Sequence, residues 1–177
     1  RAEAGTRVFL EDYVKDMPAT QKDIYYVTAE REEDARKSPV LEAARQHGCD
    51  VLLFCDPVDD YLTESLREFE GKKFVDVAKG DVAFGSEEEQ KAEKAANEKS
   101  AADLKPFLEA VKKELAASVS DVRVSTRLTD SPCCLVAQEH ALPPSMVRMM
   151  RAMKNEVPDD KRILEVNPNH PLIAKVK

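Results

Sequence analysis

The sequence has no tryptophan and only five glycines among its 177 residues, and no two of the glycines are adjacent. Loops that bind nucleotide phosphates need closely spaced glycines, so the sequence contains no phosphate-binding loop of the known kinds. The three histidines, His47, His140 and His170, lack the neighbouring Cys, Asp or Glu pattern of a metal site or an activated nucleophile. An independent small enzyme of α/β type therefore finds no support, and we expect neither a catalytic residue nor a bound metal.

Long apolar runs are also missing. The longest, residues 51–55, has the length of a strand and not the roughly 20 residues of a membrane helix. The amino terminus has no apolar segment typical of a secretory signal. The formal net charge of -7 and the isoelectric point near 5.1 argue against nucleic acid, because phosphate binding needs a basic patch. We expect neither a membrane nor a nucleic acid partner. Since both ends look cut, we also expect a piece of a longer protein.

Four cysteines are present, without the spacing of a disulfide framework or a zinc site. Cys133 and Cys134 are adjacent in a predicted strand, so their side chains point to opposite faces. Cys49 and Cys55 flank or lie within an apolar strand, where thiols behave as small hydrophobic side chains. A metal site of His47, Cys49 and Cys55 can be drawn, but buried structural roles explain these residues better. We expect a reducing compartment, the cytoplasm.

Helical and strand patterns alternate in the first half of the chain. Strands are predicted from β-branched and apolar residues at 24–28, 51–55 and 74–77. Helices are predicted at 10–17, 30–37, 40–47 and 61–69, with Asp59 or Asp60 as the cap of the last. Strands separated by helices of these lengths are typical of a parallel sheet. We predict an α/β fold that begins with a small three-layer αβα domain.

The second half follows an acidic segment, residues 85–100, which has almost no large apolar residue and indicates a linker or a solvated helix. An amphipathic helix is predicted at 103–117, with Pro106 in its first turn. Strands are predicted at 122–126, 134–137 and 163–166, and the short connection between the first two indicates an antiparallel pair. A last helix opens near residues 170–171. We predict an α+β domain with a three-stranded sheet and flanking helices.

Four of the five methionines fall between residues 146 and 153. On a helix that advances roughly 100° per residue, Met146, Met149, Met150 and Met153 share one face, and Leu142 extends it by one turn. Methionine is flexible and polarizable, so such a stripe fits an irregular core or an adaptable binding surface. Spacing alone leaves both interpretations open.

Several motifs, in order along almost the whole chain, resemble the heat shock protein 90 chaperone family. They are Leu10-Glu-Asp-Tyr-Val-Lys-Asp-Met17, Gln21-Lys-Asp-Ile-Tyr-Tyr-Val-Thr28, Lys37-Ser-Pro39, Val51-Leu-Leu-Phe54, Asp56-Pro-Val-Asp-Asp-Tyr61 and Leu66-Arg-Glu-Phe69, and in the second half Ser125-Thr-Arg-Leu-Thr-Asp-Ser-Pro132 and Ile163-Leu-Glu-Val-Asn-Pro-Asn-His-Pro171. The last two are most similar to the bacterial branch, high-temperature protein G.

The resemblance implies a division into three parts. Residues 1–84 correspond to the last α/β subdomain of the middle segment, 85–100 to an acidic linker, and 101–177 to most of the carboxy-terminal domain. The ATP- and Mg²⁺-binding domain and the final dimerisation helices of the full-length parent, a homodimer and an ATPase, lie outside such a piece. We therefore expect no cofactor in this chain and no ATP hydrolysis by it.

The resemblance also implies a role for the methionine stripe. In the family this helix is amphipathic and contacts client proteins, which implies client-binding positions at Leu142, Met146, Met149 and Met150, with Met153 left to the core. Across the cleft, the family has an aromatic residue at the position of Tyr61, and Leu62 follows it. The alternative is a purely structural module that maintains dimer geometry, with the methionine helix buried as core.

Overall fold

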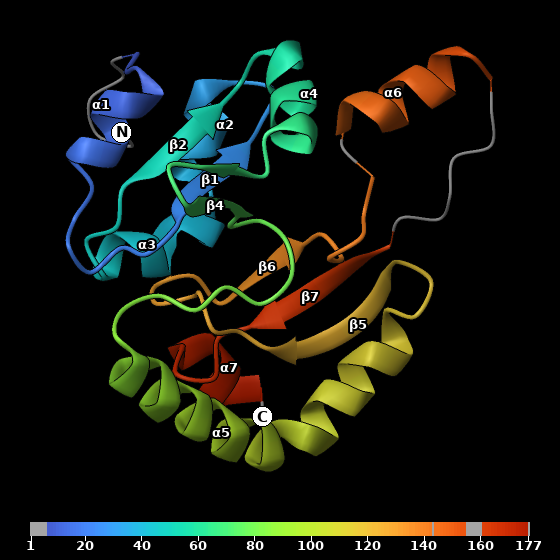
Figure 1. The fold of residues 1–177 in the computed structure, drawn as a ribbon. Coiled ribbons are helices and arrows are strands. Elements are labelled where there is room, and N and C mark those ends of the chain that lie inside the picture. The colour runs from blue at the N-terminus through green and yellow to red at the C-terminus, as the bar shows by residue number, and fades with distance from the viewer. Residues whose placement is uncertain (1–6, 143, 155–160, 177) are drawn as a thin grey trace.

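The computed structural model describes residues 7–142, 144–154 and 161–176, and contains two β-sheets with flanking helices (Figure 1). The α/β fold class with two sheets is confirmed. The first sheet has the strand order β2-β1-β4-β3, and the second has the order β5-β7-β6. Sequence order and spatial order differ in both sheets, so each contains a crossover.

In the first sheet, β1 (Ile24–Thr28) lies between β2 (Val51–Phe54) and β4 (Lys72–Asp76), and all three strands are parallel. Strand β1 consists of β-branched and aromatic residues, and its side chains are buried on both faces of the sheet. Short β3 (Glu68–Phe69) pairs antiparallel with β4 at the edge. The parallel core of this sheet agrees with the prediction, and β3 is an addition to it.

Helices pack on this sheet through two separate apolar clusters. On one side, Tyr13 of α1 (Leu10–Lys15) is buried with Ile24 and Tyr26 of β1. On the other, the cluster of Tyr25 and Val27 includes side chains from three helices. These are α2 (Glu32–Lys37), the 3-10 helix η1 (Pro39–Leu41) and α3 (Glu42–Gln46). The alternation of side chains along β1 thus supplies both clusters.

Helix α4 (Pro57–Ser65) begins and ends earlier than predicted. Its cap is Asp56, whose amide donates a hydrogen bond of 2.9 Å to Asp59 Oδ2, so Asp59 lies inside the helix. Residues 68–69, predicted as the last helical turn, form β3 instead. The prediction was wrong there because the turn at Glu70 and Gly71, both with positive φ, directs Phe69 back onto β4.

In the second sheet, β7 (Arg162–Val166) lies between β5 (Val119–Val124) and β6 (Cys133–Val136). It is parallel to β5 and antiparallel to β6. The predicted antiparallel pair of the two earlier strands is therefore wrong. The last two residues of β7, Glu165 and Val166, are buried. This burial agrees with the central position of β7 in the sheet, although β7 is the last of the three strands in the chain.

Helix α5 (Glu87–Glu114) begins at Ser86, whose amide donates a hydrogen bond of 2.7 Å to Glu89 Oε2. This capping box starts the helix within the acidic segment, so Pro106 lies in the helix interior and not in a first turn, as we had predicted. The helix changes direction about halfway along its length (Figure 1), as expected where proline removes a backbone hydrogen bond.

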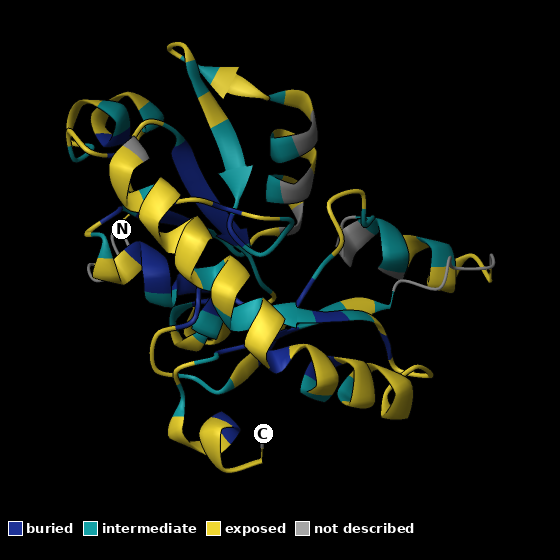
Figure 2. Cartoon of the chain, turned by 90° about the horizontal axis from the view of Figure 1, so that it is seen from below, coloured by how far each residue is buried: buried dark blue, intermediate teal, exposed yellow. Residues whose placement is uncertain are grey.

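The two halves of α5 differ in burial. Most side chains of the first half are exposed, which Figure 2 shows as a mainly yellow helix. In the second half, Leu104 and Leu108 are buried against β5 and against Ile173 of α7 (Pro171–Val176). The division of the chain into independent domains stays a prediction, because the largest core cluster includes Phe84 and also Val136 from the second sheet.

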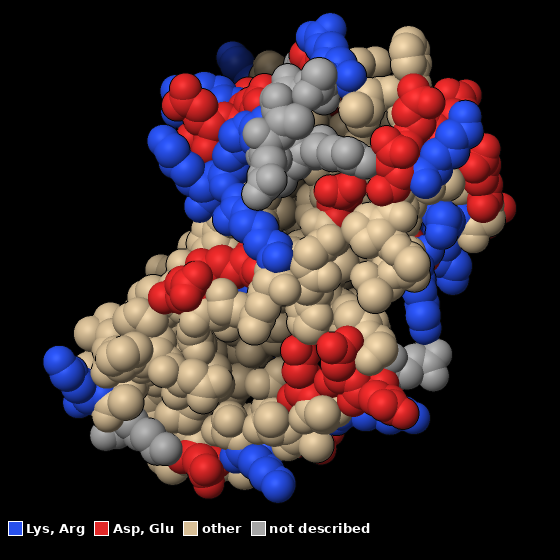
Figure 3. Space-filling model, turned by 90° about the vertical axis from the view of Figure 1, so that its left-hand side faces the viewer, with Lys and Arg blue, Asp and Glu red and all other residues tan. Residues whose placement is uncertain are grey.

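Surface charges of both signs are mixed on the face shown in Figure 3, where Lys and Arg alternate with Asp and Glu over the upper part of the molecule. Uncharged residues fill a broad band below them. Among residues 7–142, 144–154 and 161–176, no helix combines the length and the apolar character that crossing a bilayer requires.

Candidate functional site

The methionines between residues 146 and 153 were predicted to lie on a helix. Helix α6 (Pro144–Ala152) contains three of them, and Met153 directly follows its last residue. None of the four methionines is buried. Met146 and Met150 are half-buried, whereas Met149 is 45% exposed and Met153 is 63% exposed. The prediction that Met153 belongs to the core is wrong, because the helix ends at Ala152 and Met153 lies in the exposed turn that follows. The stripe does not fill the interior of this chain.

Helix α4 presents a second row of exposed apolar side chains. Val58, Tyr61 and Leu62 follow helical spacing on one side of the helix and are 66%, 60% and 41% exposed. Tyr61 and Leu62 were identified from the sequence, and Val58 was missed. The spacing of Val58 to the other two could have revealed it, once the helix was known to start at Pro57.

The structure brings these two helices together. Helices α4 and α6 contact each other on the side of the molecule away from α1 (Figure 1). We use the name α4–α6 face for the apolar side chains of these two contacting helices: Val58, Tyr61 and Leu62 of α4, Met146, Met149 and Met150 of α6, and Met153 directly after α6. Leu142, the remaining predicted contact, is half-buried and lies before the helix. Several apolar side chains exposed together are typical of an interaction site.

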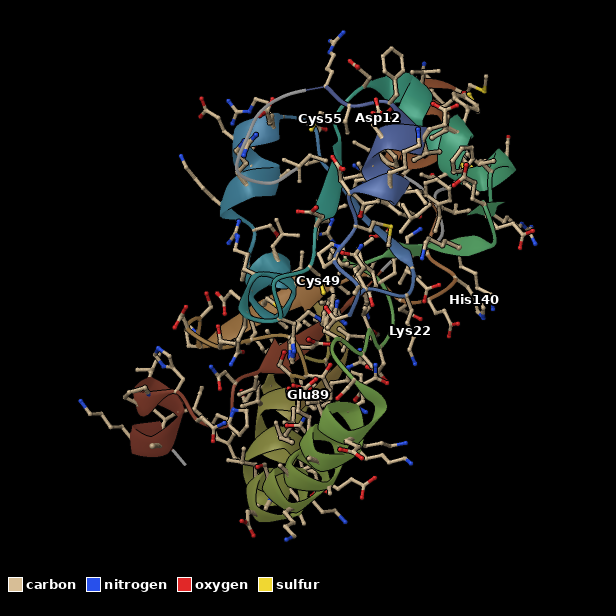
Figure 4. All side chains as sticks on the ribbon, turned by 60° about the vertical axis from the view of Figure 1, so that its left-hand side comes forward. Asp12, Lys22, Cys49, Cys55, Glu89 and His140 are labelled. Carbon is tan, nitrogen blue, oxygen red and sulfur yellow. The ribbon has the colours of Figure 1, made fainter. Side chains whose placement is uncertain are left out.

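Within the described part of the chain, no three His, Cys, Asp or Glu side chains come together in a group that could bind a metal ion. Cys49 precedes β2 and Cys55 follows it, so the two thiols lie at opposite ends of that strand (Figure 4). The metal site drawn from His47 and these two cysteines is therefore excluded by their placement.

The environments of the cysteines favour unreactive thiols. All four are free. Burial raises the pKa of Cys49 and Cys55. Burial also raises the pKa of Cys134 to about 12, with the nearby Glu165 carboxylate adding to the effect. Because the thiolate is the nucleophilic form, these three residues are poor nucleophiles at neutral pH.

The amino-acid sequence matches that of a known protein family. The sequence pattern of the family "Hsp90 protein" matches residues 2–177, almost the entire chain. The chain belongs to the Hsp90 family. "Chaperone protein HtpG" of Geobacter sulfurreducens is 46% identical over 171 residues, which are 97% of this chain and 26% of that protein. The protein of the same name from Shewanella denitrificans is 43% identical over 173 residues, covering 98% and 27%.

These relatives place the chain in the bacterial HtpG branch of the Hsp90 family, as the motifs had indicated. The chain spans about a quarter of the length of the curated relatives it matches.

Sequence reasoning missed one buried polar cluster of this Hsp90 chain. Arg127 and Glu165 form a fully buried ion pair, with a distance of 2.9 Å between Arg127 Nε and Glu165 Oε2. Ser125 Oγ donates a hydrogen bond of 2.8 Å to the same carboxylate. Both residues lie in quoted family motifs, but no local spacing signals a pair so far apart in the sequence.

A second carboxylate joins the two parts of the chain. Glu42, at the start of α3, accepts hydrogen bonds of 2.8, 2.9 and 3.1 Å from the amides of Thr129, Asp130 and Ser131, and a short one from the Ser131 hydroxyl. Burial opposes the charged form, but the bonds from Ser131 and the three amides outweigh it and lower the pKa of Glu42. The carboxylate therefore stabilises the contact between α3 and this loop.

Replacement of Glu42 by glutamine is expected to lower the free energy of unfolding at pH 7 by about 1–2 kcal/mol, because a charged acceptor of several hydrogen bonds is lost. The pKa of Glu42 is lower in the folded than in the unfolded state, so its stabilisation is fully present above a pH of about 4.3. It disappears as the pH falls through the folded-state pKa. Urea unfolding followed by far-UV circular dichroism at several pH values measures this difference.

The matched control is Glu88→Gln on the exposed side of α5. It should leave stability within about 0.5 kcal/mol of the wild type at every pH. A difference between wild type and Glu42→Gln that persists unchanged at low pH would contradict the role of the ionised carboxylate.

Proposed function

We propose that this chain is the client-binding part of a molecular chaperone, and that the α4–α6 face binds partly folded proteins. The observation that supports this most strongly is the contact between two helices that each expose apolar side chains. The name "Chaperone protein HtpG" carried by the relatives supports the chaperone role.

The residue types on the face suit partners of varied sequence. Methionine side chains adapt their rotamers to an irregular apolar surface, and a tyrosine adds a large, rigid contact with a polar tip. Met149 and Tyr61 are both about half exposed, so each has apolar area to bury on binding. Burial of such area is favourable by roughly 25 cal/mol per Å² and requires no particular partner sequence.

The test replaces Met146 and Met149 by serine in the intact protein, and separately Tyr61 by serine. We expect weaker suppression of the aggregation of a thermally unfolding enzyme, measured by light scattering against chaperone concentration. Loss of contact area worth about 1.4 kcal/mol corresponds to an about tenfold increase in the concentration needed for half-suppression.

The matched control is Phe9→Ser, an exposed aromatic side chain (76%) beside α1, far from α6 in Figure 1. It should leave suppression unchanged. If the serine variants of the α4–α6 face also suppress aggregation like the wild type, with unchanged folding, the client-binding proposal fails. A changed dimer affinity in those variants would then favour the alternative of a structural module that maintains dimer geometry.

We also propose that the chain contributes no ATP hydrolysis of its own and that a longer parent protein handles ATP and Mg²⁺ elsewhere. The isolated glycines of the sequence support this, because nucleotide phosphates are usually bound by loops with several closely spaced glycines. Homodimer formation by the parent is part of the same proposal.

A further inference from the structure

The chain leaves β4 through residues 77–81, which we call the seam segment, and this segment is bound by side chains of β5 and of the connection that follows β5. The Val77 carbonyl accepts a short hydrogen bond from Arg127 Nη1. The Gly80 carbonyl accepts from Arg127 Nη2 and, at 3.1 Å, from Arg123 Nη2. The carboxylate of Asp81 forms a 2.8 Å ion pair with the same Arg123. Two guanidinium groups therefore bind successive polar groups of one short segment.

The two guanidinium groups are oriented by one buried carboxylate. Glu165 is fully buried, and its Oε1 lies 2.8 Å from Arg123 Nη2 while its Oε2 lies 2.9 Å from Arg127 Nε. The guanidinium is planar with donors in a fixed fork, so these bonds define its direction as well as its position. Every buried polar side-chain atom of the described residues has a hydrogen-bond partner, so the cluster is fully satisfied.

The other side of the seam segment is bonded to the chain that leads into α6. The Ala137 amide donates a 3.0 Å hydrogen bond to the Ala78 carbonyl, and Lys79 and Ala137 form a parallel bridge. Lys79 Nζ donates a 3.4 Å hydrogen bond to the Ala141 carbonyl and lies 3.9 Å from Asp76 Oδ2. Ala141 comes shortly before α6, so the ammonium group links the end of β4 to the approach of that helix.

We propose that Lys79, Arg123 and Arg127 are positioning residues that set the distance between α4 and α6, and so assemble the α4–α6 face. Helix α4 is continuous with the β3–β4 hairpin, and β4 leads directly into the seam segment. Helix α6 begins three residues after Ala141 in the sequence, and the Ala141 carbonyl accepts the hydrogen bond from Lys79. The seam segment thus offers a bonded route between the two helices in addition to their own contact. That this distance matters for function rests on the proposed client binding. The bonds of the seam segment and the distance between the two helices do not depend on that proposal.

The test measures the distance between α4 and α6 directly in the intact protein. Bioorthogonal spin labels at Val58 of α4 and Arg151 of α6, both exposed, report it by pulsed electron spin resonance. We expect one narrow distance distribution in the wild type, and a shifted or broadened one in Lys79→Met and in Arg123→Met. Lys79→Arg retains a cation that can reach the Ala141 carbonyl, and it should restore the narrow distribution.

The control variant is Arg31→Met, which removes an exposed ion pair with Asp34 in the first half of the chain. It should leave the distribution unchanged. Asp81→Asn is the mildest seam variant, since the Asp81 side chain is 71% exposed and the substitution removes only its charge. A distribution like that of the wild type in Asp81→Asn, Lys79→Met and Arg123→Met, all folded by circular dichroism, would overturn the inference.

The outcomes also separate this inference from the proposed function. A shifted distance with normal suppression of aggregation would retain the positioning role and remove the client-binding role of the face. An unchanged distance in the seam variants, together with lost suppression in the Met146 and Met149 variant, would remove the positioning role and retain the client-binding role of the face.

Discussion

Replacement of Arg127 by methionine is expected to lower the free energy of unfolding by about 3–5 kcal/mol. Methionine fills part of the same volume, but it leaves the buried carboxylate of Glu165 without its main partner. The Val77 carbonyl also loses its guanidinium donor. The carboxylate keeps only Arg123 on Oε1 and the Ser125 hydroxyl on Oε2, and a buried charge that has lost one of its two guanidinium partners costs more than the pair itself contributes.

Urea unfolding followed by far-UV circular dichroism measures the loss, since the chain has no tryptophan for fluorescence. The exposed Arg31→Met variant serves again as the control and should change stability by no more than about 0.5 kcal/mol. The double variant Arg127→Met, Glu165→Leu should recover part of the stability, because it removes both charges at once. If Arg127→Met alone costs less than about 1 kcal/mol, the buried pair does not have the assigned role.

This buried cluster illustrates which features the sequence could not predict. Arg127 and Glu165 are far apart in the chain, and either residue alone is typical of a solvated surface. Their pairing depends on β7 entering the second sheet between β5 and β6. Local patterns predicted each of these strands but not their order, because a short connection favours a hairpin until a later strand displaces it.

Elements with a strong local signal were predicted well. The β-branched and aromatic run of β1 and the apolar run of β2 were located within one residue of their observed bounds. The methionine helix was also found, because four large apolar residues at helical spacing leave little choice. The starts of α4 and α5 were missed, since each depends on a cap (Asp56 and Ser86) in a segment with little apolar content.

The candidate site was predicted as residues and not as a surface. The sequence identified Tyr61, Leu62 and the methionines, yet it could not decide whether the stripe was exposed. Exposure is a property of tertiary packing: α6 lies against α4 and over neither sheet, so its second side remains open. Met153 was misassigned for the same reason, because helical spacing says nothing about where the packed part of a helix ends.

Replacement of Phe84 by alanine is expected to lower the free energy of unfolding by about 3–5 kcal/mol, as for other large aromatic residues in cores. Phe84 is 2% exposed and packs edge-to-face on Tyr25, with ring centroids 5.0 Å apart. The His47 ring also stacks on Phe84, with ring centroids 6.3 Å apart. A cavity in this position also removes the packing immediately before the capping box of α5.

Hydrogen exchange measured by mass spectrometry distinguishes the local from the global consequence of this variant. The first half of α5 is mostly exposed, and the 3.1 Å contact between His47 Nε2 and Glu93 Oε1 attaches it to the end of α3. With Phe84 gone, His47 loses its stacking partner, and exchange in residues 87–100 should accelerate more than in β1. Phe9→Ala, which truncates an exposed ring, should change neither stability nor exchange. Equal acceleration in α5 and β1 would mean that Phe84 stabilises the whole core alike and does not anchor the helix, because a local anchor must affect its own segment first.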